Sequence, residues 1–468
     1  MAFLTSSCSS GNSAESVGSR DSTATVAAAT AFDSSLAKGI VTDNISCRNQ
    51  SEQTYALYLP SYYSSDKKFP CIFFFDAHAR GALPLKKYRE LAEKYGFIMA
   101  GSDVSKNGMA WPATNDVVKA MMDDVASRIN IDPKRIYTAG FSGGSRVASS
   151  IALFDGGVAG VIGCASGFPQ NGNGAQNKFD YFGIVGDYDF NVIDMEKLDE
   201  ALEQNSFNHQ LLTFKGKHEW APLSEFQTAI LWIQVNAMKE NLQTKKDTII
   251  VALKNDYENR LVEAKSSHDP VTEQKLLNGI VKTVDGLSDI SSFKKQLADL
   301  TASADLKNAV SLQGQILQNE INYQQELSKD ISDKDGKWWI GKITELNQNI
   351  HKAKTSQESQ MYQRLLNFSG LLFYLSANHA LNTGDLINAE TFLKVFKMAD
   401  PKNPDCDYLD AIFFIKKGNQ QEAIASLKRA ASLGFDDVLQ LANEPAFSSL
   451  QNDAEFNKIM GIVKGNNK

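Results

Sequence analysis

Residues 140–144, GFSGG, have the pattern G-x-S-x-G, which places a serine between small residues. Residues 136–139 before the motif are β-prone, and residues 147–153 after it are compatible with a helix. A serine at the tip of a strand-to-helix turn has strained backbone, and flanking glycines let the two limbs pass closely. The pattern predicts that Ser142 is a nucleophile, with the positive end of the following helix stabilising negative charge on a substrate oxygen. A glycine-rich turn without a catalytic role is the alternative.

An acid and a histidine follow in the order that a serine nucleophile requires. Asp187 and Asp189 come directly after a strand-like run, and His218 lies in a short loop before a predicted helix. The 29 positions from Asp189 to His218 accommodate one helix and one strand, which returns the chain to the same edge of a sheet. We expect His218 to act as general base toward Ser142. Asp189, three residues past the glycine that ends the strand, is the preferred acid to orient it, and Asp187 is the alternative acid.

The elements that must position these side chains alternate between strands and helices. Residues 71–75 form a continuous apolar run, which suits a central strand buried on both faces. A helix capped by Thr114 or Asn115 carries apolar residues at helical spacing through Ile129. The β-α-β alternation predicts an α/β fold with a mostly parallel sheet and helices on both faces. Further strands are expected at 39–59 (two), 97–100, 158–165, 181–185 and 209–214, and further helices at 85–95 and 223–238.

Residues from about 40 to 238 resemble the α/β-hydrolase superfamily. The stretch 124–147, together with His218-Glu219-Trp220, is similar to its esterase branch, the polyhydroxybutyrate depolymerase and feruloyl esterase-like enzymes. That branch usually has a His-Gly pair after the third strand, where this sequence has Asp76-Ala77. The resemblance implies an α/β-hydrolase fold and a Ser-Asp-His triad.

Two loops are expected to complete the site. In hydrolases of this build, the residue after the nucleophile and the loop after the buried strand each supply one backbone N–H to the oxyanion hole. These donors would be Gly143 and His78. Trp111 lies in a polar loop, 102–113, at the carboxyl end of a strand, where ligands of open α/β sheets bind. Trp111 is therefore a possible substrate contact, and an ordinary packed tryptophan is the alternative.

The second half of the chain is helical in pattern and ends in a repeat. Gly384, Ala389 and Leu393 recur as Gly418, Ala423 and Leu427, each 34 residues later. This period is typical of tetratricopeptide repeats, and the resemblance covers about two units. We expect a flexible tether over 1–38, a hydrolase domain over 39–238, further helices over 239–360 and tetratricopeptide-like repeats over 361–468. The repeats would either bind a protein partner or act as a lid and brace for the hydrolase.

Composition excludes some classes of function. The 468-residue chain carries 48 Lys and Arg against 55 Asp and Glu, a net charge of −7, which does not favour nucleic-acid binding. The five cysteines lack metal-ligand spacing, so neither a zinc site nor a disulfide framework is expected. Small residues precede Cys8, and a Ser/Gly-rich tract follows it, as in the tail of a bacterial lipoprotein signal. A periplasmic or membrane-anchored lipoprotein with a lipidated Cys8 is expected, and a cytoplasmic protein is the alternative.

The function predicted from these residues is that of a serine esterase. Ser142 would attack a small or polymer-derived carboxylic ester and form an acyl-enzyme, which water activated by His218 would hydrolyse, without a metal or organic cofactor. A serine peptidase of the same superfamily is the nearest alternative, because the same triad cleaves amides. A non-catalytic scaffold that binds proteins through its helical repeats is an alternative from a different class.

Overall fold

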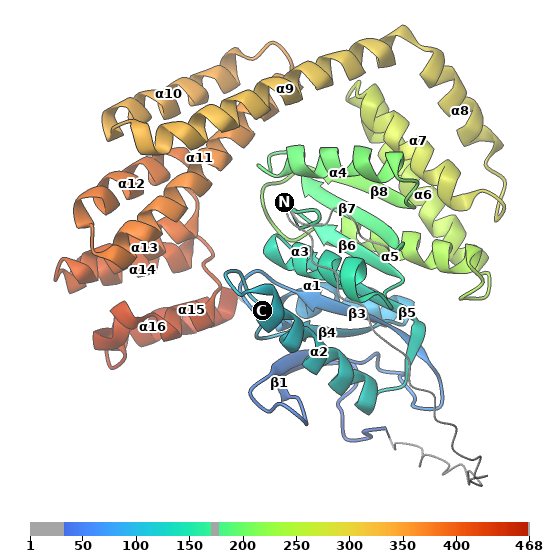
Figure 1. Cartoon of the computed structure of the whole chain (residues 1–468), viewed down its shortest axis with the longest axis horizontal. Helices are drawn as coiled ribbons and strands as arrows, with labels where there is room; N and C mark the ends of the chain where they lie inside the picture. Colours follow the sequence, from blue (N-terminus) through green and yellow to red (C-terminus); the bar gives the residue numbers. More distant parts are fainter. Residues whose placement is uncertain (1–31, 170–176, 467–468) are drawn as a thin grey trace, which may run out of the picture.

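The computed structural model describes residues 32–169 and 177–466. Its first part is built on one sheet of eight strands in the order β1-β2-β4-β3-β5-β6-β7-β8 (Figure 1). β2 pairs antiparallel with β1 and β4, and every other neighbouring pair is parallel. The strands are β1 (Val41–Ser46), β2 (Thr54–Tyr58), β3 (Phe69–Phe75), β4 (Ile98–Ser102), β5 (Ile131–Phe141), β6 (Gly160–Cys164), β7 (Asp180–Gly186) and β8 (His209–Phe214).

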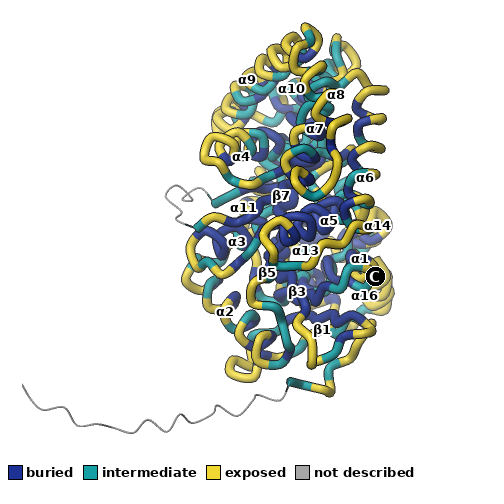
Figure 2. The backbone as a smooth tube through the Cα atoms, turned by 90° about the vertical axis from the view of Figure 1, so that its right-hand side faces the viewer, coloured by how far each residue is buried: buried dark blue, intermediate teal, exposed yellow. Residues whose placement is uncertain are grey.

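Helices cover both faces of this sheet, and their buried residues meet it along the centre of the molecule (Figure 2). One face carries α1 (Ala82–Tyr95) and α5 (Leu223–Lys239). The other carries α2 (Trp111–Arg128), α3 (Gly143–Ser150) with the π-helical turn Ile151–Asp155, and α4 (Val192–Gln204). The predicted α/β fold with a mostly parallel sheet, followed by an all-helical region, is confirmed.

The central strand β3 explains how one sheet serves two hydrophobic cores. All seven of its residues are buried. Because side chains alternate along a strand, Ile72 and Phe74 pack toward α1 and α5, whereas Phe73 and Phe75 pack toward α2 and α3. The continuous apolar run predicted as a doubly buried strand is therefore confirmed.

Three further helices extend the core on the α5 side. These are α6 (Asp247–Ser266), α7 (Pro270–Val284) and α8 (Ser291–Ala302), and their apolar side chains join the same cluster as the sheet and α1. α5 is buried along nearly its whole length, because it lies between the sheet and this second helical layer. The side chains that α6 to α8 add to the cluster include Leu253, Tyr257, Leu277, Ile280 and Phe293.

This packing predicts where the chain can be cut. A fragment ending at Lys239 is expected to be insoluble or to lack a cooperative unfolding transition, because it exposes the outer face of α5. Each large apolar side chain left uncovered forgoes about 1.5–3 kcal/mol. A fragment ending at Ala302 keeps the whole cluster and is expected to be soluble and to unfold cooperatively. Soluble yield and thermal unfolding followed by circular dichroism compare the two. Equal Tm values for both fragments would contradict the prediction.

The remaining helices form what we call the helical region, residues 304–466, with a hydrophobic cluster of its own. Its first helix, α9 (Ala304–Asp333), leaves α7 and α8 and crosses to α11 (Figure 1). The others are α10 (Gly336–Lys352), α11 (Ser356–Thr383), α12 (Leu386–Ala399), α13 (Pro404–Lys416), α14 (Gln420–Ser432), α15 (Val438–Asn443), the 3-10 turn Pro445–Leu450 and α16 (Ala454–Asn466).

The repeated residues occupy matching places in two helical hairpins, α11/α12 and α13/α14. Gly384 and Gly418 have φ angles of 78° and 75°, the left-handed conformation that glycine adopts readily at the end of a helix. Ala389 and Ala423 are fully buried, which lets the paired helices approach closely. The two hairpins thus share the 34-residue offset, and the tetratricopeptide type remains a prediction.

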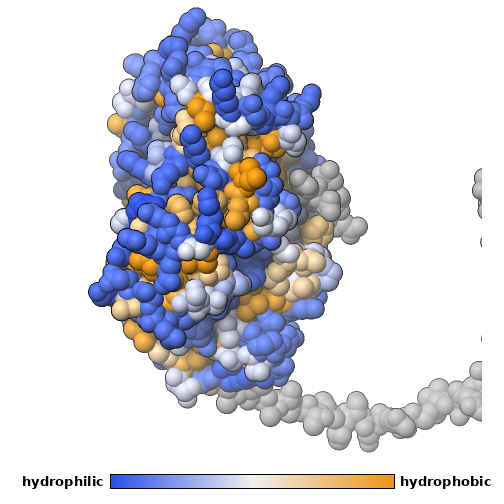
Figure 3. Space-filling model, turned by 90° about the vertical axis from the view of Figure 1, so that its left-hand side faces the viewer, coloured by the Kyte–Doolittle hydropathy of each residue, from blue (hydrophilic) through white to orange (hydrophobic). Residues whose placement is uncertain are grey.

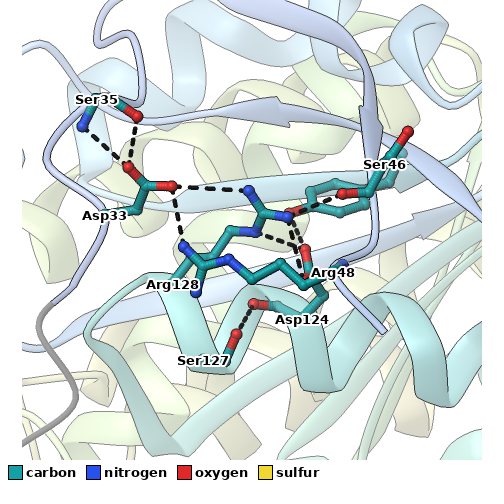
Figure 4. Close-up of polar contacts among 8 residues, drawn as sticks. Asp33, Ser35, Ser46, Arg48, Asp124, Ser127 and Arg128 are labelled. Atoms are coloured by element: carbon teal, nitrogen blue, oxygen red, sulfur yellow. Dashed lines mark hydrogen bonds and ion pairs between the residues drawn. The ribbon is translucent and has the colours of Figure 1, made fainter. Parts of the chain in front are cut away.

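A polar cluster ties the beginning of the described chain to the sheet domain (Figure 4). Asp33 forms ion pairs with Arg48, at 3.1 Å, and with Arg128, at 3.7 Å. Buried Asp124 in turn accepts from Arg128 Nε at 2.7 Å and from the hydroxyl of Tyr55 at 2.8 Å. Within the described part of the predicted tether, Asp33 therefore lies against the end of α2. Cys8 lies outside the described residues.

Candidate active site

The structure brings Ser142, His218 and Asp189 together at the carboxyl ends of β5, β7 and β8. Ser142 Oγ lies 2.9 Å from His218 Nε2. His218 Nδ1 lies 3.0 Å from Asp189 Oδ2 and 3.1 Å from Asp189 Oδ1. Asp189 is fully buried, whereas 22% of the His218 side chain is exposed. A substrate can therefore approach these three residues from the side of Ser142 and His218, and not from the side of Asp189.

The turn that carries Ser142 has the strained geometry expected of an exposed nucleophile. Ser142 has φ 55° and ψ −120°, outside the regions that L-residues prefer, and immediately precedes α3. A Cβ on Gly140 would lie 2.1 Å from the carbonyl oxygen of Gly144, and one on Gly144 would lie 2.0 Å from that of Phe75. Gly140 therefore lets β5 and α3 pass each other, as the pattern G-x-S-x-G predicted, and Gly144 lets α3 approach the end of β3.

Asp187 and Asp189 have different contacts, although they are two residues apart. Asp187 Oδ1 accepts from the backbone N–H of Gly216 at 3.1 Å, and its Oδ2 accepts from Gln360 Nε2 at 3.0 Å. Burial raises the pKa of Asp187 above its usual range. Asp187 thus joins residues 186–190, which we call the acid turn, to the loop 215–219 that carries His218. Asp189 is the carboxylate that contacts the imidazole of His218.

Two aromatic rings flank the imidazole of His218. The ring of Phe190 stacks on it with a centroid distance of 4.4 Å, and the ring of Phe141 lies 4.8 Å away. Phe141 immediately precedes Ser142, and Phe190 immediately follows Asp189. The residues next to the nucleophile and the acid therefore also fix the plane of the imidazole ring.

The geometry does not support His78 as an oxyanion donor. The His78 amide donates to Asp76 Oδ1 at 2.9 Å and is therefore engaged. Ala77, one residue earlier, has no acceptor for its amide among the described residues. The Gly143 amide is the first of α3, and amides in the first turn of a helix lack acceptors within the helix. The amides of Gly143 and Ala77 are thus the two that remain available.

Asp76 anchors the loop that carries Ala77. Its carboxylate is 1% exposed and accepts from Arg80 Nε at 2.9 Å and from Trp220 Nε1 at 2.8 Å, in addition to His78. Burial alone would raise the pKa of Asp76, but Arg80 and these hydrogen bonds lower it. A charged Asp76 therefore fixes the loop between β3 and α1.

Trp111 is the first residue of α2 rather than part of a loop. The helix begins there because Ala110 has extended backbone and Pro112 suits the first helical turn, so neither Thr114 nor Asn115 is the cap. The Trp111 ring packs against Phe154 with a centroid distance of 6.2 Å. In this structure Trp111 is therefore a partly buried packing residue of the core between α2 and α3.

The loop before α2 nevertheless reaches the site at a different residue. The backbone N–H of Asn107 donates to the carbonyl oxygen of Ala77 at 2.9 Å. Its side chain is so close to the turn that a Cβ on Gly143 would lie 1.7 Å from Asn107 Oδ1. Asn107 is exposed, and nothing in the sequence pattern around it marks it as a site residue.

The helical region contacts all three loops of the site. Arg80, next to the Ala77 loop, donates to Asp436 at 2.8 Å. Lys217, beside His218, pairs with Asp400 at 2.9 Å. Arg364 on α11 donates to the carbonyl oxygen of Asp187 at 3.0 Å. These contacts join the helical region to the edge of the sheet where the triad lies.

Metal-binding clusters and membrane-spanning helices are both absent from the described residues. No group of three or more His, Cys, Asp or Glu side chains in the described chain is arranged to hold a metal ion. No helix of the described residues is long and apolar enough to cross a membrane. The four described cysteines, Cys47, Cys71, Cys164 and Cys406, are free and buried.

Comparisons with known proteins return distant structural neighbours. No protein-family model matches the chain, and no curated protein matches it in sequence. An S-formylglutathione hydrolase from Staphylococcus aureus is similar at 15% identity over 42% of this chain and 97% of its own, with a TM-score of 0.35. The esterase Est2 from Thermogutta terrifontis is similar at 15% identity over 44% and 94%, with a TM-score of 0.34. Esterase B from Lactobacillus rhamnosis is similar at 14% identity over 44% and 89%, with a TM-score of 0.36.

Proposed function

We propose that the protein is a serine esterase that hydrolyses a carboxylic ester through an acyl-enzyme on Ser142. The observation that carries this proposal is the unbroken series of contacts from Ser142 Oγ through His218 to the buried carboxylate of Asp189. A hydroxyl, an imidazole and a carboxylate in this order are the groups that activate a serine for attack on a carbonyl.

In the first half of the reaction, His218 Nε2 takes the proton from Ser142 Oγ as Oγ bonds to the ester carbonyl carbon. Asp189 accepts the Nδ1–H of His218, which holds the imidazole in the required tautomer and stabilises the imidazolium. The proton then passes from His218 to the leaving alcohol as the ester bond breaks. In the second half, His218 Nε2 takes a proton from water as the water oxygen bonds to the acyl carbon. The bond from that carbon to Ser142 Oγ then breaks, His218 returns the proton to Oγ, and the carboxylic acid leaves.

The amides of Gly143 and Ala77 are the donors that we assign to the oxyanion. Gly143 lies at the positive end of α3, where the helix dipole adds to the effect of the N–H. Ala77 is held beside it, because Asp76 is fixed by Arg80 and Trp220. Removing one oxyanion donor typically costs about 10²–10³ in turnover.

We also propose that the helical region braces the catalytic loops rather than serving as a separate docking module. Three contacts between the helical region and the catalytic loops support this role. They are those of Arg364 with Asp187, of Lys217 with Asp400 and of Arg80 with Asp436. On the helical side seen in Figure 3, hydrophobic patches are separated by hydrophilic side chains. Such a mixed surface does not by itself mark a protein-binding site.

A fluorophosphonate probe tests the proposal directly. The probe is expected to label the full chain at Ser142, and prior addition of a short-chain p-nitrophenyl ester is expected to slow the labelling. A panel of short-acyl esters, feruloyl esters and peptide substrates then defines the bond cleaved. Turnover of peptides alone would replace the esterase by a peptidase. If the chain is not labelled and turns over no substrate, the esterase proposal fails, and a non-catalytic scaffold that binds proteins through its helical repeats is the alternative that remains.

A further inference from the structure

Three side chains of the helical region donate to the backbone of the turn that carries Asp189. Arg364 Nη1 donates to the carbonyl oxygen of Asp187 at 3.0 Å. Asn367 Nδ2 donates to that of Tyr188 at 2.6 Å, and Gln324 Nε2 donates to that of Phe190 at 3.3 Å. The carbonyls on both sides of Asp189 are therefore bound by residues more than 130 positions away along the chain.

The donors on α11 form one stripe. Gln360, Arg364 and Asn367 are spaced i, i+4 and i+7, which places them on the same face of a helix. All three bind the acid turn, because Gln360 donates to the Asp187 carboxylate at 3.0 Å. Apolar contacts alone would suffice for a helix that only packs on the sheet domain. On α11, three polar side chains of one helix face instead all donate hydrogen bonds to the acid turn.

Arg364 is itself held rigidly. It is 5% exposed, and its partner Glu320 on α9 is fully buried. Arg364 Nε lies 2.9 Å and 3.0 Å from the two carboxylate oxygens of Glu320, and Nη2 lies 2.5 Å from Oε2. One edge of the guanidinium, formed by Nε and Nη2, is thus fixed by Glu320 within the helical region, and Nη1 projects to the acid turn.

The acid turn controls two groups around the imidazole. Asp189 supplies the carboxylate at Nδ1, and Phe190 supplies the ring stacked at 4.4 Å. A shift of the backbone between Tyr188 and Phe190 therefore moves the acid and the aromatic wall together. A misplacement of about 1 Å, even from a change remote from the chemistry, costs on the order of 100-fold in rate.

We propose that the polar stripe of α11, Gln360, Arg364 and Asn367, positions the acid turn for catalysis. Arg364, held by Glu320, and Asn367 are then positioning residues, and the helical region completes the active site. This inference rests on the proposed esterase function.

Asn367→Leu is the sharpest test. It removes the donor to Tyr188 with a side chain of similar size, whereas an Arg364 variant leaves the buried Glu320 unpaired and endangers folding. Asn378→Leu is the matched control: it makes the same exchange on α11, at a side chain with no hydrogen bond among the described residues. Both are made in the full chain, and active sites are counted with the fluorophosphonate probe.

Asn367→Leu is expected to lower kcat per labelled site about 10- to 100-fold, with less than about a twofold change in KM. The acidic limb of the pH profile of kcat/KM is expected to move to lower pH, because a displaced carboxylate stabilises the His218 imidazolium less. Asn378→Leu is expected to match the wild type in kcat per labelled site, in KM and in the position of the acidic limb. A purely structural role for Asn367 would lower Tm and the number of labelled sites without moving the limb.

Wild-type kcat per labelled site and an unmoved acidic limb in Asn367→Leu would overturn the inference. A second variant, Gln360→Leu, removes the donor of the same stripe to Asp187 Oδ2 and is expected to lower kcat per labelled site less than Asn367→Leu but in the same direction. It keeps the inference testable if Asn367→Leu does not fold, and wild-type kcat per labelled site in Gln360→Leu would then count against the inference. Failure of the esterase proposal is recognised separately, since the wild-type chain would then neither label nor turn over an ester.

Discussion

Ser142→Ala is expected to abolish probe labelling and to lower ester turnover by several powers of ten. The variant removes the only atom of the triad that bonds to the substrate carbon, and comparable losses in another serine hydrolase are on the order of 10⁶ in kcat. The fold is expected to persist, because alanine accepts the φ of 55° no worse than serine and the glycines around it are unchanged. Turnover of a p-nitrophenyl ester and far-UV circular dichroism measure the two effects.

Ser150→Ala is a suitable control for this variant. Ser150 is the last residue of α3, the helix that Ser142 precedes, and its hydroxyl donates within that helix to the carbonyl oxygen of Arg146 at 2.7 Å. Its loss is expected to leave labelling and turnover within about twofold of the wild type. Wild-type turnover in Ser142→Ala would remove the proposed function.

Asp189→Asn is expected to be the second most damaging exchange, with Asp187→Asn far milder. Asparagine at 189 keeps the shape of aspartate, but its amide can hold the imidazole of His218 in the wrong tautomer, and the same exchange in a serine protease costs about 10⁴ in turnover. Asparagine at 187 retains an oxygen that accepts from the Gly216 amide and loses mainly the contact with Gln360. We expect a loss of about tenfold or less there.

The two variants are compared at neutral pH by kcat and KM, with folding checked by thermal unfolding. A larger loss for Asp187→Asn would mean that the acid turn rearranges when substrate binds and exchanges the two carboxylates. No loss in either variant would require an acid from another strand.

The sequence predicts the sheet well, because its signals are local. The run at 71–75 is apolar throughout since both of its faces are covered, and Gly140 and Gly144 mark the close passage of a strand and a helix. The distance along the chain from Asp189 to His218 matches one helix and one strand, and the structure places the two side chains 3.0 Å apart. Local patterns of this kind are preserved because they follow from the strand and helix periods themselves.

The failures concern contacts that have no local signal, or positions where two local signals compete. The amide of His78 is engaged by Asp76, whose burial and pairing with Arg80 depend on the folded loop. α2 begins at Trp111 because Pro112 suits a first helical turn, a signal that competes in the sequence with the possible caps at 114 and 115. The hydrogen bonds between α11 and the acid turn join residues that lie 173–179 positions apart in the sequence. Helix and strand periodicity cannot predict contacts between residues so far apart.

The contacts between α11 and the acid turn join parts of the protein that the ribosome makes at different times. Synthesis proceeds at about 5–20 residues per second, so the segment from His218 to Asn367 takes on the order of 10–30 s to appear. During that interval the triad is present in the nascent chain, but the carbonyls beside Asp189 have only water as donor. A newly made hydrolase sheet is therefore expected to remain a poor catalyst until α11 has emerged and docked, which delays ester hydrolysis until the rest of the molecule is folded.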